Sequence, residues 1–539
     1  MKILIVVPRY ELTTKPSYFY WYPFGLGYIS AVLKKEGYTV DCLNLNHYEG
    51  KSQDILKDKL DSTKYSYVCT GNHVVHYYEA RIILNTARKH PTKPITIFGG
   101  TMITTEPEII FNDLCPTFGV IGEGERTIVE LINCIENKKN PENVPGLIYK
   151  QKNKLIITQK RDVIMDLDSL PLPDFEGLEF EKKLNNVKNH FGYELSIFDK
   201  PRVYPLLASR ACPFQCTFCY HEPVYRKRSI KNIMKELTTN VKKYKINIIT
   251  IFDECFSLDK NRLFEFCEAM KQLISDIDWD LRWSCQLIVN TVDGEILRVM
   301  KDAGCYLVGY GFESYSHIVL KSMKKAITPE RINNALTETF NANLIIRACF
   351  LFGDIAETKE TAQITLNYWK NNCKGQVSLT MVQPYPGTYI YQHCINKGLI
   401  KDKLDFIKKI GFVHEKAAVN MTNYMTDEEI GELEKEMNTH IGRYSNFVTP
   451  LRKKRIGKKT YSFTVKCPFC KKIIKYGNFY VKHPLYYGGE VACKNCYKTF
   501  YLSGIIYMTG FKYYGIIKNP FNKLKRVVNA VRKNIIKGS

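Results

Sequence analysis

Residues 204–220 read Tyr204-Pro-Leu-Leu-Ala-Ser-Arg-Ala-Cys212-Pro-Phe-Gln-Cys216-Thr-Phe-Cys219-Tyr220. A strand-like apolar segment therefore leads directly into three cysteines, with three residues and then two residues between them. With 18 cysteines in 539 residues, chance produces this spacing only roughly 0.02 times in such a chain. We interpret the three cysteines as ligands that share one loop.

Three thiolates on one loop are the donor set of an iron–sulfur site with an open position. A 4Fe-4S cluster normally takes four thiolates, so three leave one iron without a protein ligand. An open position is typical of catalytic metal sites. Disulfides are not expected instead, because the first eight residues read as a β-strand rather than an export signal, and cytosolic thiols stay reduced. We expect a cytoplasmic metalloprotein.

The segments that follow the loop alternate between strand-like and helix-like patterns. This alternation favours a parallel sheet, and we predict a full or partial (β/α) barrel over residues 196–400. The predicted barrel strands are Tyr204–Ala208, Ile248–Phe252, Asp280–Cys285, Tyr306–Gly309, Ile345–Phe352 and Val377–Val382.

A three-cysteine loop after the first strand of such a barrel resembles the radical S-adenosylmethionine (SAM) superfamily. In that family the open iron binds the amino and carboxylate groups of SAM, and an electron from the cluster cleaves a carbon–sulfur bond to give a 5′-deoxyadenosyl radical. Four later segments are similar to family motifs, in the expected order: Ile251-Phe-Asp253-Glu254-Cys-Phe256, Gly311-Phe-Glu313-Ser314, Phe350-Leu-Phe-Gly353-Asp-Ile-Ala-Glu357-Thr358 and Pro384-Tyr-Pro386-Gly387-Thr388.

The resemblance assigns roles to individual side chains. Cys212, Cys216 and Cys219 would bind the cluster. The other expected contacts are Phe218 and Tyr220 against adenine, Asp253 and Glu254 in the acidic motif, and Glu313 and Ser314 near the methionyl or ribose part of SAM. Each carboxylate also fits a simpler interpretation, a solvated or capping group. Ile288 stands where relatives often have an arginine. The resemblance therefore predicts no arginine contact from this strand to the carboxylate or ribose of SAM.

Residues 1–145 show a second alternation of strands and helices, typical of a Rossmann-like domain. The predicted elements are a helix over Gly25–Gly37 and strands over Ile3–Val7, Thr39–Leu43, Tyr67–Thr70, Ile95–Phe98 and Gly119–Ile121. Glycines follow the strands, among them Gly99, Gly100 and Gly122. Open α/β sheets bind ligands at the carboxyl ends of their strands, where glycine permits close approach. Ordinary turn glycines are the alternative interpretation.

The strand-end motifs resemble the cobalamin-binding domain that is fused to one branch of radical SAM enzymes. The matching residues are Pro8, Pro23-Phe-Gly25-Leu-Gly27-Tyr-Ile-Ser30, Gly99-Gly100-Thr101 and Gly122-Glu123-Gly-Glu125, so the resemblance covers about residues 1–400. It implies that Gly99, Gly100, Gly122 and Glu123 contact cobalamin.

The family resemblance leaves cobalt without a histidine from the usual position. The Asp-x-His-x-x-Gly loop that would supply it after the first strand is missing, and we interpret His47 as a loop histidine. Met102 also replaces a histidine that relatives often have. A rival family, the radical SAM methylthiotransferases, carries three cysteines in this domain for a second cluster. No cysteine follows the first strand here, so we expect the cysteines at 42, 69 and 115 to be buried apolar residues.

The C-terminal residues differ from the rest in charge. From Leu451 to Ser539 there are 21 Lys and Arg against one acid, Glu490, so this part carries 21 − 1 = +20 of the total +24. Residues 451–502 contain two Cys-x-x-Cys pairs, whose cysteines are Cys467, Cys470, Cys493 and Cys496. Two such pairs are typical of a zinc ribbon, and four thiolates close the coordination sphere, so we predict structural zinc. A second iron–sulfur cluster is the alternative.

Three further segments complete the predicted organisation. Residues 146–195 are a proline-marked connector, and residues 401–450 are a helical segment. Residues 503–539 form a basic tail in which Leu524, Val527, Val528, Val531 and Ile535 share one helical face. Such a tail would bind an anionic membrane surface or nucleic acid, so residues 451–539 are the expected partner surface. A solvated tail is the alternative.

These features predict a radical SAM enzyme with a 4Fe-4S cluster, SAM, cobalamin and structural zinc. The resemblance implies a methyltransferase acting on an unactivated carbon of a small-molecule or lipid-linked substrate. SAM would serve as radical source and methyl donor, and a flavodoxin or ferredoxin would supply electrons. The alternatives are a radical-mediated cyclase, oxidase or rearrangement enzyme of the same fold, or an RNA-modifying enzyme that binds RNA through its C-terminal module.

Overall fold

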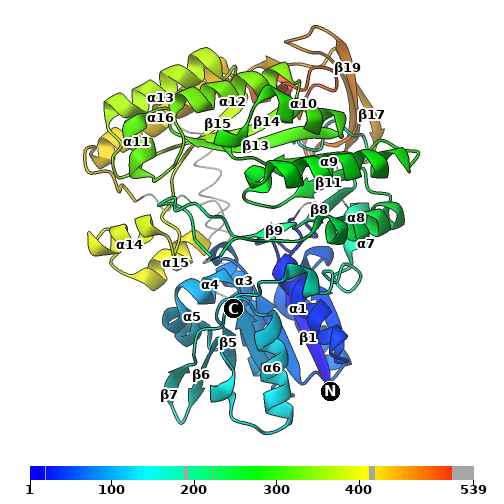
Figure 1. Ribbon diagram of the computed structural model, residues 1–539, viewed down its shortest axis with the longest axis vertical. Helices are drawn as coiled ribbons and strands as arrows, with labels where there is room; N and C mark the ends of the chain where they lie inside the picture. Colours follow the sequence, from blue (N-terminus) through cyan, green and yellow to red (C-terminus); the bar gives the residue numbers. More distant parts are fainter. Residues whose placement is uncertain (18–19, 187–191, 223, 412–418, 513–539) are drawn as a thin grey trace.

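The structure is a computed structural model that describes residues 1–17, 20–186, 192–222, 224–411 and 419–512. These residues form two α/β units, one above the other in Figure 1, and a smaller β-rich module. The N-terminal domain is the lower unit, and the barrel-like sheet is the upper one.

The N-terminal domain is built on a seven-stranded sheet with the order β2-β1-β3-β4-β5-β6-β7. Its strands are β1 (Lys2–Val7), β2 (Thr39–Asn44), β3 (Tyr67–Gly71), β4 (Ile95–Gly99), β5 (Phe118–Val120), β6 (Leu147–Gln151) and β7 (Lys154–Ile157). The first five run parallel. Their order is that of a doubly wound α/β fold, as the predicted alternation requires.

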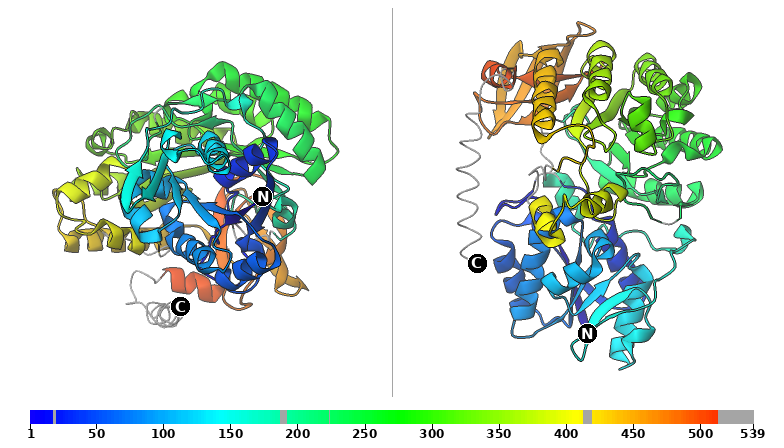
Figure 2. Two further views of the ribbon diagram at one scale, coloured as in Figure 1. Left: turned by 90° about the horizontal axis from the view of Figure 1, so that it is seen from below. Right: turned by 90° about the vertical axis from the view of Figure 1, so that its left-hand side faces the viewer.

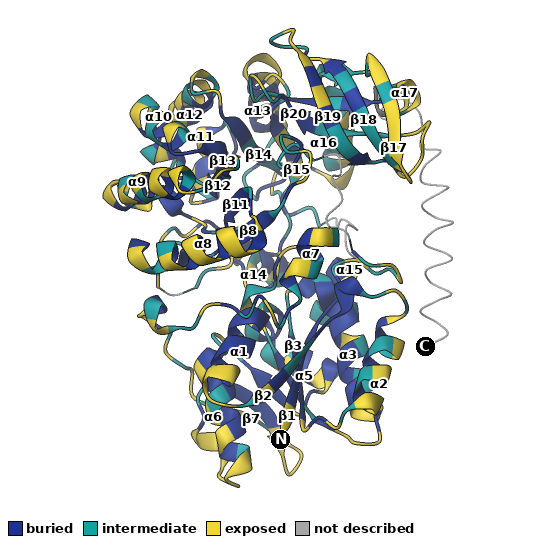
Figure 3. Cartoon of the chain, turned by 90° about the vertical axis from the view of Figure 1, so that its right-hand side faces the viewer, coloured by how far each residue is buried: buried dark blue, intermediate teal, exposed yellow. Residues whose placement is uncertain are grey.

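Successive residues of β1 enter two cores because side chains along a strand alternate in direction. Ile5 packs in the core on the side of α1 and α6, and Val6 packs in the core on the side of α2 and α3. The helices of this domain are α1 (Phe24–Lys35), α2 (Ser52–Ser62), α3 (Tyr77–Lys89), α4 (Thr101–Thr105), α5 (Pro107–Leu114) and α6 (Glu125–Glu136). Figure 3 shows buried residues along the sheet and exposed ones on the outer sides of the helices.

The N-terminal sheet extends beyond residue 145, the predicted end of this domain. β6 pairs antiparallel with β5 and with β7. Lys152 and Asn153 form the turn between β6 and β7 in the left-handed conformation, with φ of 48° and 62°. Such a two-residue turn matches the twist of a β-hairpin. The segment 146–195 therefore begins as part of the sheet rather than as a connector.

The second unit is a sheet of six parallel strands in the order β8-β11-β12-β13-β14-β15. The strands are β8 (Val203–Leu206), β11 (Ile248–Ile251), β12 (Arg282–Gln286), β13 (Cys305–Glu313), β14 (Ile345–Phe352) and β15 (Val377–Met381). The connecting helices are α8 (Ile230–Tyr244), α9 (Lys260–Ser275), α10 (Gly294–Asp302), α11 (His317–Ser322), α12 (Pro329–Asn341) and α13 (Lys359–Asn372). Within the described residues β8 and β15 do not pair, so the barrel is partial.

An aromatic cluster joins the two units through the proline-marked segment and α7 (Phe180–Asn186). Phe175 stacks on Tyr22 of the N-terminal domain with ring centroids 4.6 Å apart, and its centroid lies 4.9 Å from that of Tyr204 in β8. Asp174, the preceding residue, accepts a hydrogen bond from Lys34 of α1. The apolar cores of the two units are therefore continuous.

Residues 401–450 form two helices in different places rather than one segment. α15 (Lys403–Gly411) packs with α14 (Tyr389–Asn396) in an apolar cluster that includes residues of α3 and α5 in the N-terminal domain. α16 (Asp427–Tyr444) instead packs against α13 and β15 of the barrel. The segment thus contacts both units.

The C-terminal module contains two small sheets. One is β17 (Arg452–Gly457), β18 (Thr460–Lys466) and β19 (Ile473–Tyr480), and the other is β16 (Phe447–Val448), β21 (Thr499–Ser503) and β20 (Gly488–Ala492). Ala492 shares an apolar cluster with Val203, Ile248 and Ile345, which each begin a barrel strand. The module therefore covers the amino-terminal end of the barrel sheet, and Figure 2 shows it at the end of the molecule away from the N-terminal domain.

One helix, α17 (Ile505–Lys512), follows the module. The remainder of the predicted basic tail, residues 513–539, lies outside the described residues. None of the helices in the described ranges is long and apolar enough to cross a membrane.

Candidate active site

The three predicted cluster cysteines lie on the loop between β9 (Ser209–Arg210) and β10 (Arg226–Lys227). These two short strands pair antiparallel and close the loop at its base. The loop follows β8 and so lies at the carboxyl end of the barrel strands, on the side of the N-terminal domain (Figure 1). Thr217 fixes its middle, because its N–H donates to the Met323 carbonyl and its carbonyl accepts from the Ile390 N–H.

Asp253 holds the chain just before the loop. Its Oδ1 accepts hydrogen bonds from the N–H groups of Ala208 and Ser209 at 2.7 and 3.0 Å, and its Oδ2 accepts from the Ser209 hydroxyl at 2.7 Å. Both oxygens therefore accept hydrogen bonds from the chain, and Asp253 positions the loop. Glu254 is exposed beside it, and its charge opposes ionisation of the Cys212 thiol.

Glu313 and Lys325 form an ion pair beside the cysteines. Glu313 ends β13 in the left-handed conformation, with φ of 59°, which is uncommon for a non-glycine residue and frequent at functional sites. Its buried carboxylate lies 2.9 Å from the Lys325 Nζ. Burial alone would lower the pKa of Lys325, but Glu313 and the Cys216 thiol raise it above its usual value. Lys325 is therefore a fixed cation at the cluster loop.

Two residues of this site were missed in the sequence. The Lys325 charge acts on the thiols of Cys212, Cys216 and Cys219, yet nothing in the sequence brings residue 325 to that loop. Cys255 has its Sγ 3.2 Å from the Cys212 Sγ, and this contact lowers the pKa of the Cys212 thiol. Cys255 belongs to the acidic segment after β11, where a single cysteine carried no spacing signal.

The other residues expected to contact SAM lie in different surroundings. Tyr220 is 36% exposed and packs so closely on Gly387 that a Cβ there would lie 2.9 Å from the ring. Phe218 is half-buried beside the cluster of α14. Ser314 is buried, with its hydroxyl 3.2 Å from that of Thr365 in α13. The two aromatic rings are thus accessible to a ligand, whereas the serine faces the helix layer.

The N-terminal domain provides the opposite wall of the site. A Cβ on Gly122 would meet no atom within 4 Å, and one on Gly100 would approach the Asn72 backbone at 2.9 Å. Gly100 and Gly122 have φ of 96° and 81°, values that favour glycine. Gly99 ends β4, so these glycines lie at the carboxyl ends of the strands, where open α/β sheets bind ligands.

Glu123 forms ion pairs with two arginines near the cysteine loop. Its Oε1 accepts hydrogen bonds from Arg210 at 2.8 Å and from Arg226 at 2.6 Å. Arg210 also donates to Glu125 at 2.6 Å. Both arginines border the cysteine loop, so the Gly-Glu-Gly-Glu segment ties this loop to the N-terminal domain.

The histidine and cysteines singled out in the N-terminal domain are dispersed. His47 is buried, with its ring nitrogens 2.7 Å from the Tyr20 hydroxyl and 3.1 Å from the Glu179 carboxylate. Cys69 is buried, Cys42 is half-buried and Cys115 is exposed. The prediction that all three cysteines are buried is wrong for Cys115, because it caps α5 in a left-handed conformation at the surface.

The four cysteines of the C-terminal module come together. Their Sγ atoms lie within 4.8 Å of one another, and they belong to Cys467, Cys470, Cys493 and Cys496. Each pair follows the end of a strand, β18 or β20. Four converging sulfur atoms fit one tetrahedral metal.

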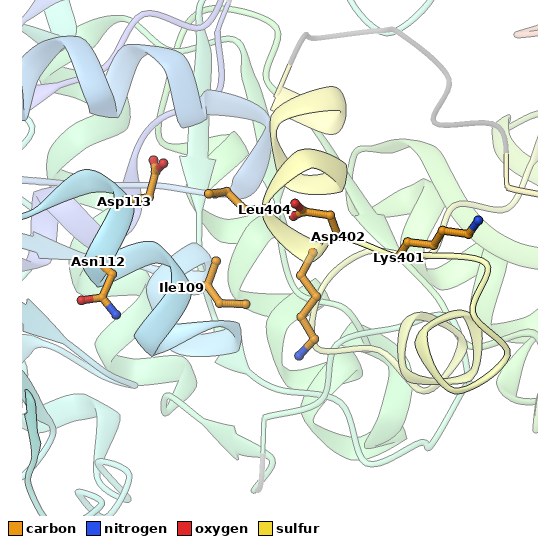
Figure 4. Close-up of a pocket in the computed structure, with 7 residues that line it drawn as sticks. Ile109, Asn112, Asp113, Lys401, Asp402 and Leu404 are labelled. Atoms are coloured by element: carbon orange, nitrogen blue, oxygen red, sulfur yellow. The ribbon is translucent and has the colours of Figure 1, made fainter.

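A hollow of about 640 Å³ opens between α5 and the start of α15 (Figure 4). It is lined by Ile109, Asn112, Asp113, Lys401, Asp402, Lys403 and Leu404. Lys403 pairs with Glu106, and Asp113 pairs with Lys408. These charges neutralise one another within the seam, and none of the predicted site residues lines it.

Comparisons with known proteins agree with this geometry. Residues 206–368 match the family model of the radical SAM superfamily. An uncharacterised methyltransferase of Pyrococcus horikoshii is 28% identical over 416 residues, which cover 74% of this chain and 84% of that protein. The anaerobic magnesium-protoporphyrin IX monomethyl ester cyclase of Cereibacter sphaeroides is 25% identical, over 76% of this chain and 66% of that protein.

The fold is also similar to that of a solved structure. The radical SAM methyltransferase TsrM of Kitasatospora setae, with cobalamin and a 4Fe-4S cluster bound, superposes with a TM-score of 0.58 and 16% identity. The match covers 73% of this chain and 75% of TsrM.

Proposed function

Because this chain is a radical SAM enzyme, we propose that it is a cobalamin-dependent methyltransferase that acts on an unactivated carbon. The substrate is a small molecule or a lipid-linked compound, and an external donor such as a flavodoxin or ferredoxin supplies electrons. The observation that carries this proposal is the position of the cysteine loop, which faces the glycine-lined strand ends of a second α/β domain. Radical generation and methyl transfer would then share one interface.

The chain's own groups fit the two ends of SAM. Cys212, Cys216 and Cys219 supply three thiolates to a 4Fe-4S cluster and leave one iron for SAM. Glu313 and Lys325 present opposite charges beside this loop, which complements the ammonium and carboxylate of the methionyl part. Phe218 and Tyr220 offer rings to the adenine.

Gly99, Gly100 and Gly122 would hold cobalamin through the open edge of the N-terminal sheet. When bound, the cluster supplies the electron for SAM cleavage, and cobalamin carries the methyl group between SAM and substrate. The Arg210 and Arg226 contacts with Glu123 keep the two walls of the site in register.

Product analysis tests the proposal. The protein, reconstituted anaerobically with iron, sulfide and hydroxocobalamin, is incubated with SAM and a strong reductant. A methyltransferase of this type consumes SAM in two ways, so both 5′-deoxyadenosine and S-adenosylhomocysteine should form. Alanine at Cys212, Cys216 and Cys219 together should abolish 5′-deoxyadenosine, whereas alanine at the exposed Cys115 should not.

A second function is favoured by the likeness to the cyclase. A cyclase of this fold would release 5′-deoxyadenosine but would make no S-adenosylhomocysteine. Corrinoid that is retained without any S-adenosylhomocysteine would therefore overturn the methyltransferase proposal in favour of the cyclase. An RNA-modifying role is less well supported, because the basic module lies at the amino-terminal end of the barrel, opposite the cysteine loop.

We also propose that Cys467, Cys470, Cys493 and Cys496 hold one structural zinc ion in a ribbon-like module. Support comes from the convergence of their four sulfur atoms. Four thiolates complete the tetrahedral coordination of zinc and leave no position for a substrate, which is typical of structural zinc. The module also belongs to the most basic part of the sequence, and a polyanion or an anionic membrane is its expected partner.

A further inference from the structure

Strand β17 of the C-terminal module is a basic strand at the outer edge of its sheet. Its sequence, Arg452-Lys-Lys-Arg-Ile-Gly457, is exposed at every position except the half-buried Lys453. The opposite edge of the sheet is β19, where the Gly477 N–H donates to Asp199 of the segment before the barrel. β17 therefore lies on the side away from the barrel, and Figure 3 shows it exposed at the outer side of the module, close to α17.

Within the described part of the module, acidic side chains do not oppose this charge on the outer side. Residues 451–512 contain 14 Lys and Arg and one acid, Glu490. Glu490 lies on the docked side, where burial and the nearby Glu194 raise its pKa to about 7. Asp199, which pairs with Lys494, belongs to the same side. Basic residues on an edge strand also prevent aggregation, so charge alone does not assign a partner.

Apolar side chains project beside β17, from one loop of the module and from the start of α17. Leu485 of the loop is 66% exposed, and Ile505 and Ile506 of the helix are 68% and 58% exposed. The loop contacts the helix start, because the Gly504 N–H donates to the Tyr487 carbonyl at 2.9 Å. Large apolar side chains that are exposed together mark surfaces for interaction.

Lys453 joins the basic strand to this loop. Its Nζ donates to the Pro484 carbonyl at 2.5 Å and lies 4.3 Å from the centroid of the Tyr487 ring. The Tyr486 and Tyr507 rings then link the loop to α17, with centroids 5.3 Å apart. The exposed basic and apolar side chains thus belong to one surface. We call it the docking patch, and it consists of Arg452, Lys454, Arg455, Leu485, Ile505 and Ile506.

The composition of the docking patch distinguishes between two kinds of anionic partner. Single-stranded nucleic acid is bound by basic grooves with aromatic rings on which the bases stack, but the most exposed apolar side chains here are aliphatic. Aliphatic side chains beside basic ones are typical of surfaces that enter the headgroup region of an anionic membrane. Tyrosines, such as Tyr486 and Tyr507, are also frequent at that depth.

We propose that the docking patch binds the enzyme to the surface of an anionic membrane. The basic side chains of β17 contact the lipid headgroups, and Leu485, Ile505 and Ile506 enter the boundary between headgroups and acyl chains. The inference rests on the part of the proposed function that gives this module an anionic partner, and it selects the membrane. The enzyme would then be a peripheral membrane protein, attached through the module that covers the amino-terminal end of its barrel.

Sedimentation of the full-length protein with lipid vesicles tests the proposal. Vesicles of phosphatidylcholine mixed with phosphatidylglycerol should sediment the protein, and vesicles of phosphatidylcholine alone should not. Each basic side chain at an anionic surface changes the partition coefficient about fivefold. Arg452→Gln, Lys454→Gln and Arg455→Gln together should therefore lower it on the order of 100-fold. Ile505→Ser with Ile506→Ser should lower it roughly tenfold or more, because their apolar surface no longer leaves water.

Two matched variants provide the controls. Lys64→Gln, Lys89→Gln and Lys139→Gln remove the same charge from exposed positions of the N-terminal domain. Ile157→Ser with Ile364→Ser removes two isoleucines that are 47% and 48% exposed outside the module. Both variants should bind anionic vesicles like the wild type. Because all these positions are exposed, circular dichroism should show unchanged folding in each variant.

Three results would overturn the proposal. The first is wild-type protein that does not sediment with anionic vesicles but binds single-stranded RNA, which would assign the patch to nucleic acid. The second is equal weakening by the two charge variants, which would show a general attraction of a basic protein. The third is unchanged binding after Ile505→Ser with Ile506→Ser, which would show that nothing enters the membrane. Vesicle binding needs neither cofactor nor turnover, so its failure would leave the methyltransferase proposal untouched.

Discussion

The ion pair between Glu313 and Lys325 places two opposite charges beside three thiols that would carry negative charge on a cluster. Lys325 is mostly buried, with 20% of its side chain exposed, so solvent screens its charge only in part. The backbone of Glu313 adopts a strained conformation at this point. Strain is retained where the surrounding structure over-determines it, which is frequent at ligand sites.

Replacing Lys325 should weaken SAM binding. A hydrogen bond to a charged group contributes about 1.5–3 kcal/mol, so Lys325→Met should raise the Kd for SAM roughly 10- to 100-fold, with Lys325→Arg in between. Equilibrium binding of SAM to the cluster-loaded protein measures this. Lys324→Met, at the exposed neighbouring position, is the matched control. Equal affinities for the two methionine variants would exclude Lys325 from the SAM site.

At the scale of residues, the sequence predicts positions best where spacing along the chain carries the signal. Cys212, Cys216 and Cys219 could be placed together because they share one short loop after β8. Lys325 and Cys255 could not, because their approach to that loop depends on how distant barrel loops fold onto it. The hydrogen-bond partners of Asp253 and Glu123 could not be predicted either, because they belong to distant parts of the chain.

At the scale of elements, the short strand pair β9–β10 and Asp253 define where the cysteine loop begins. The carboxylate accepts three hydrogen bonds from Ala208 and from Ser209, the first residue of β9. A buried carboxylate that is so fully bonded acts as a clamp on the backbone. The loop therefore depends on the segment after β11 for its position.

Asp253→Asn should loosen the loop. An amide has one acceptor oxygen where the carboxylate has two, so at least one buried donor loses its partner at a cost of about 1–3 kcal/mol. We expect lower thermal stability and less iron per chain after reconstitution. Asp293→Asn is the control, because Asp293 caps α10 at its N-terminus and asparagine caps equally well. Full iron content in Asp253→Asn would show that the Asp253 carboxylate is not needed to position the cysteine loop.

Most elements follow from local pattern, since buried parallel strands are apolar runs bounded by glycine or polar residues. The β6–β7 hairpin was missed because its strands follow a run of helices and strands and were assigned to a linker. Its signal was present in two short apolar runs, within Leu147–Gln151 and Lys154–Ile157, on either side of Lys152 and Asn153. The split of residues 401–450 had no local signal, because each helix is placed by the surface it covers.

At the scale of the whole molecule, the Glu123 network links the two halves of the site. Arg226 is buried, with 1% of its side chain exposed. Glu123→Gln leaves the Arg226 charge with weaker partners, so we expect the free energy of unfolding to fall by up to about 3–5 kcal/mol. The proposed methyl transfer needs both domains, so its rate should fall more than the rate of SAM cleavage. The ratio of S-adenosylhomocysteine to 5′-deoxyadenosine should therefore decrease.

A surface ion pair provides the comparison for this variant. Glu130 pairs with Arg161 and is 46% exposed, so Glu130→Gln should change stability by less than about 1 kcal/mol and leave the product ratio unchanged. Urea unfolding and product quantification measure the two effects. An unchanged ratio in Glu123→Gln would mean that the network is not needed to align the domains.

The order of the units along the chain could be read from motifs and charge, but not which end of the barrel the C-terminal module covers. That placement depends on contacts between distant segments. Gln376 exchanges hydrogen bonds with the Thr499 backbone, the Ser196 hydroxyl accepts from the Ala492 N–H, and Asp199 pairs with Lys494. The module is docked on the barrel rather than independent of it.

This docking sets the expected effect of removing the proposed zinc. Folding of a small four-thiolate module depends on its metal, so Cys470→Ser with Cys496→Ser should unfold β17–β21 and uncover the apolar strand starts at Ile248 and Ile345. Hydrogen exchange should rise in residues 447–503 and at these strand starts. The cysteine loop lies at the other end of the strands, so SAM cleavage per bound cluster should stay within about twofold of wild type, a change of ~0.4 kcal/mol in barrier.

Metal analysis should find one zinc fewer per chain and unchanged iron. Loss of iron in place of zinc would identify a second iron–sulfur cluster in the module, and loss of cleavage in folded, cluster-loaded protein would show that the module supports the active site through the barrel.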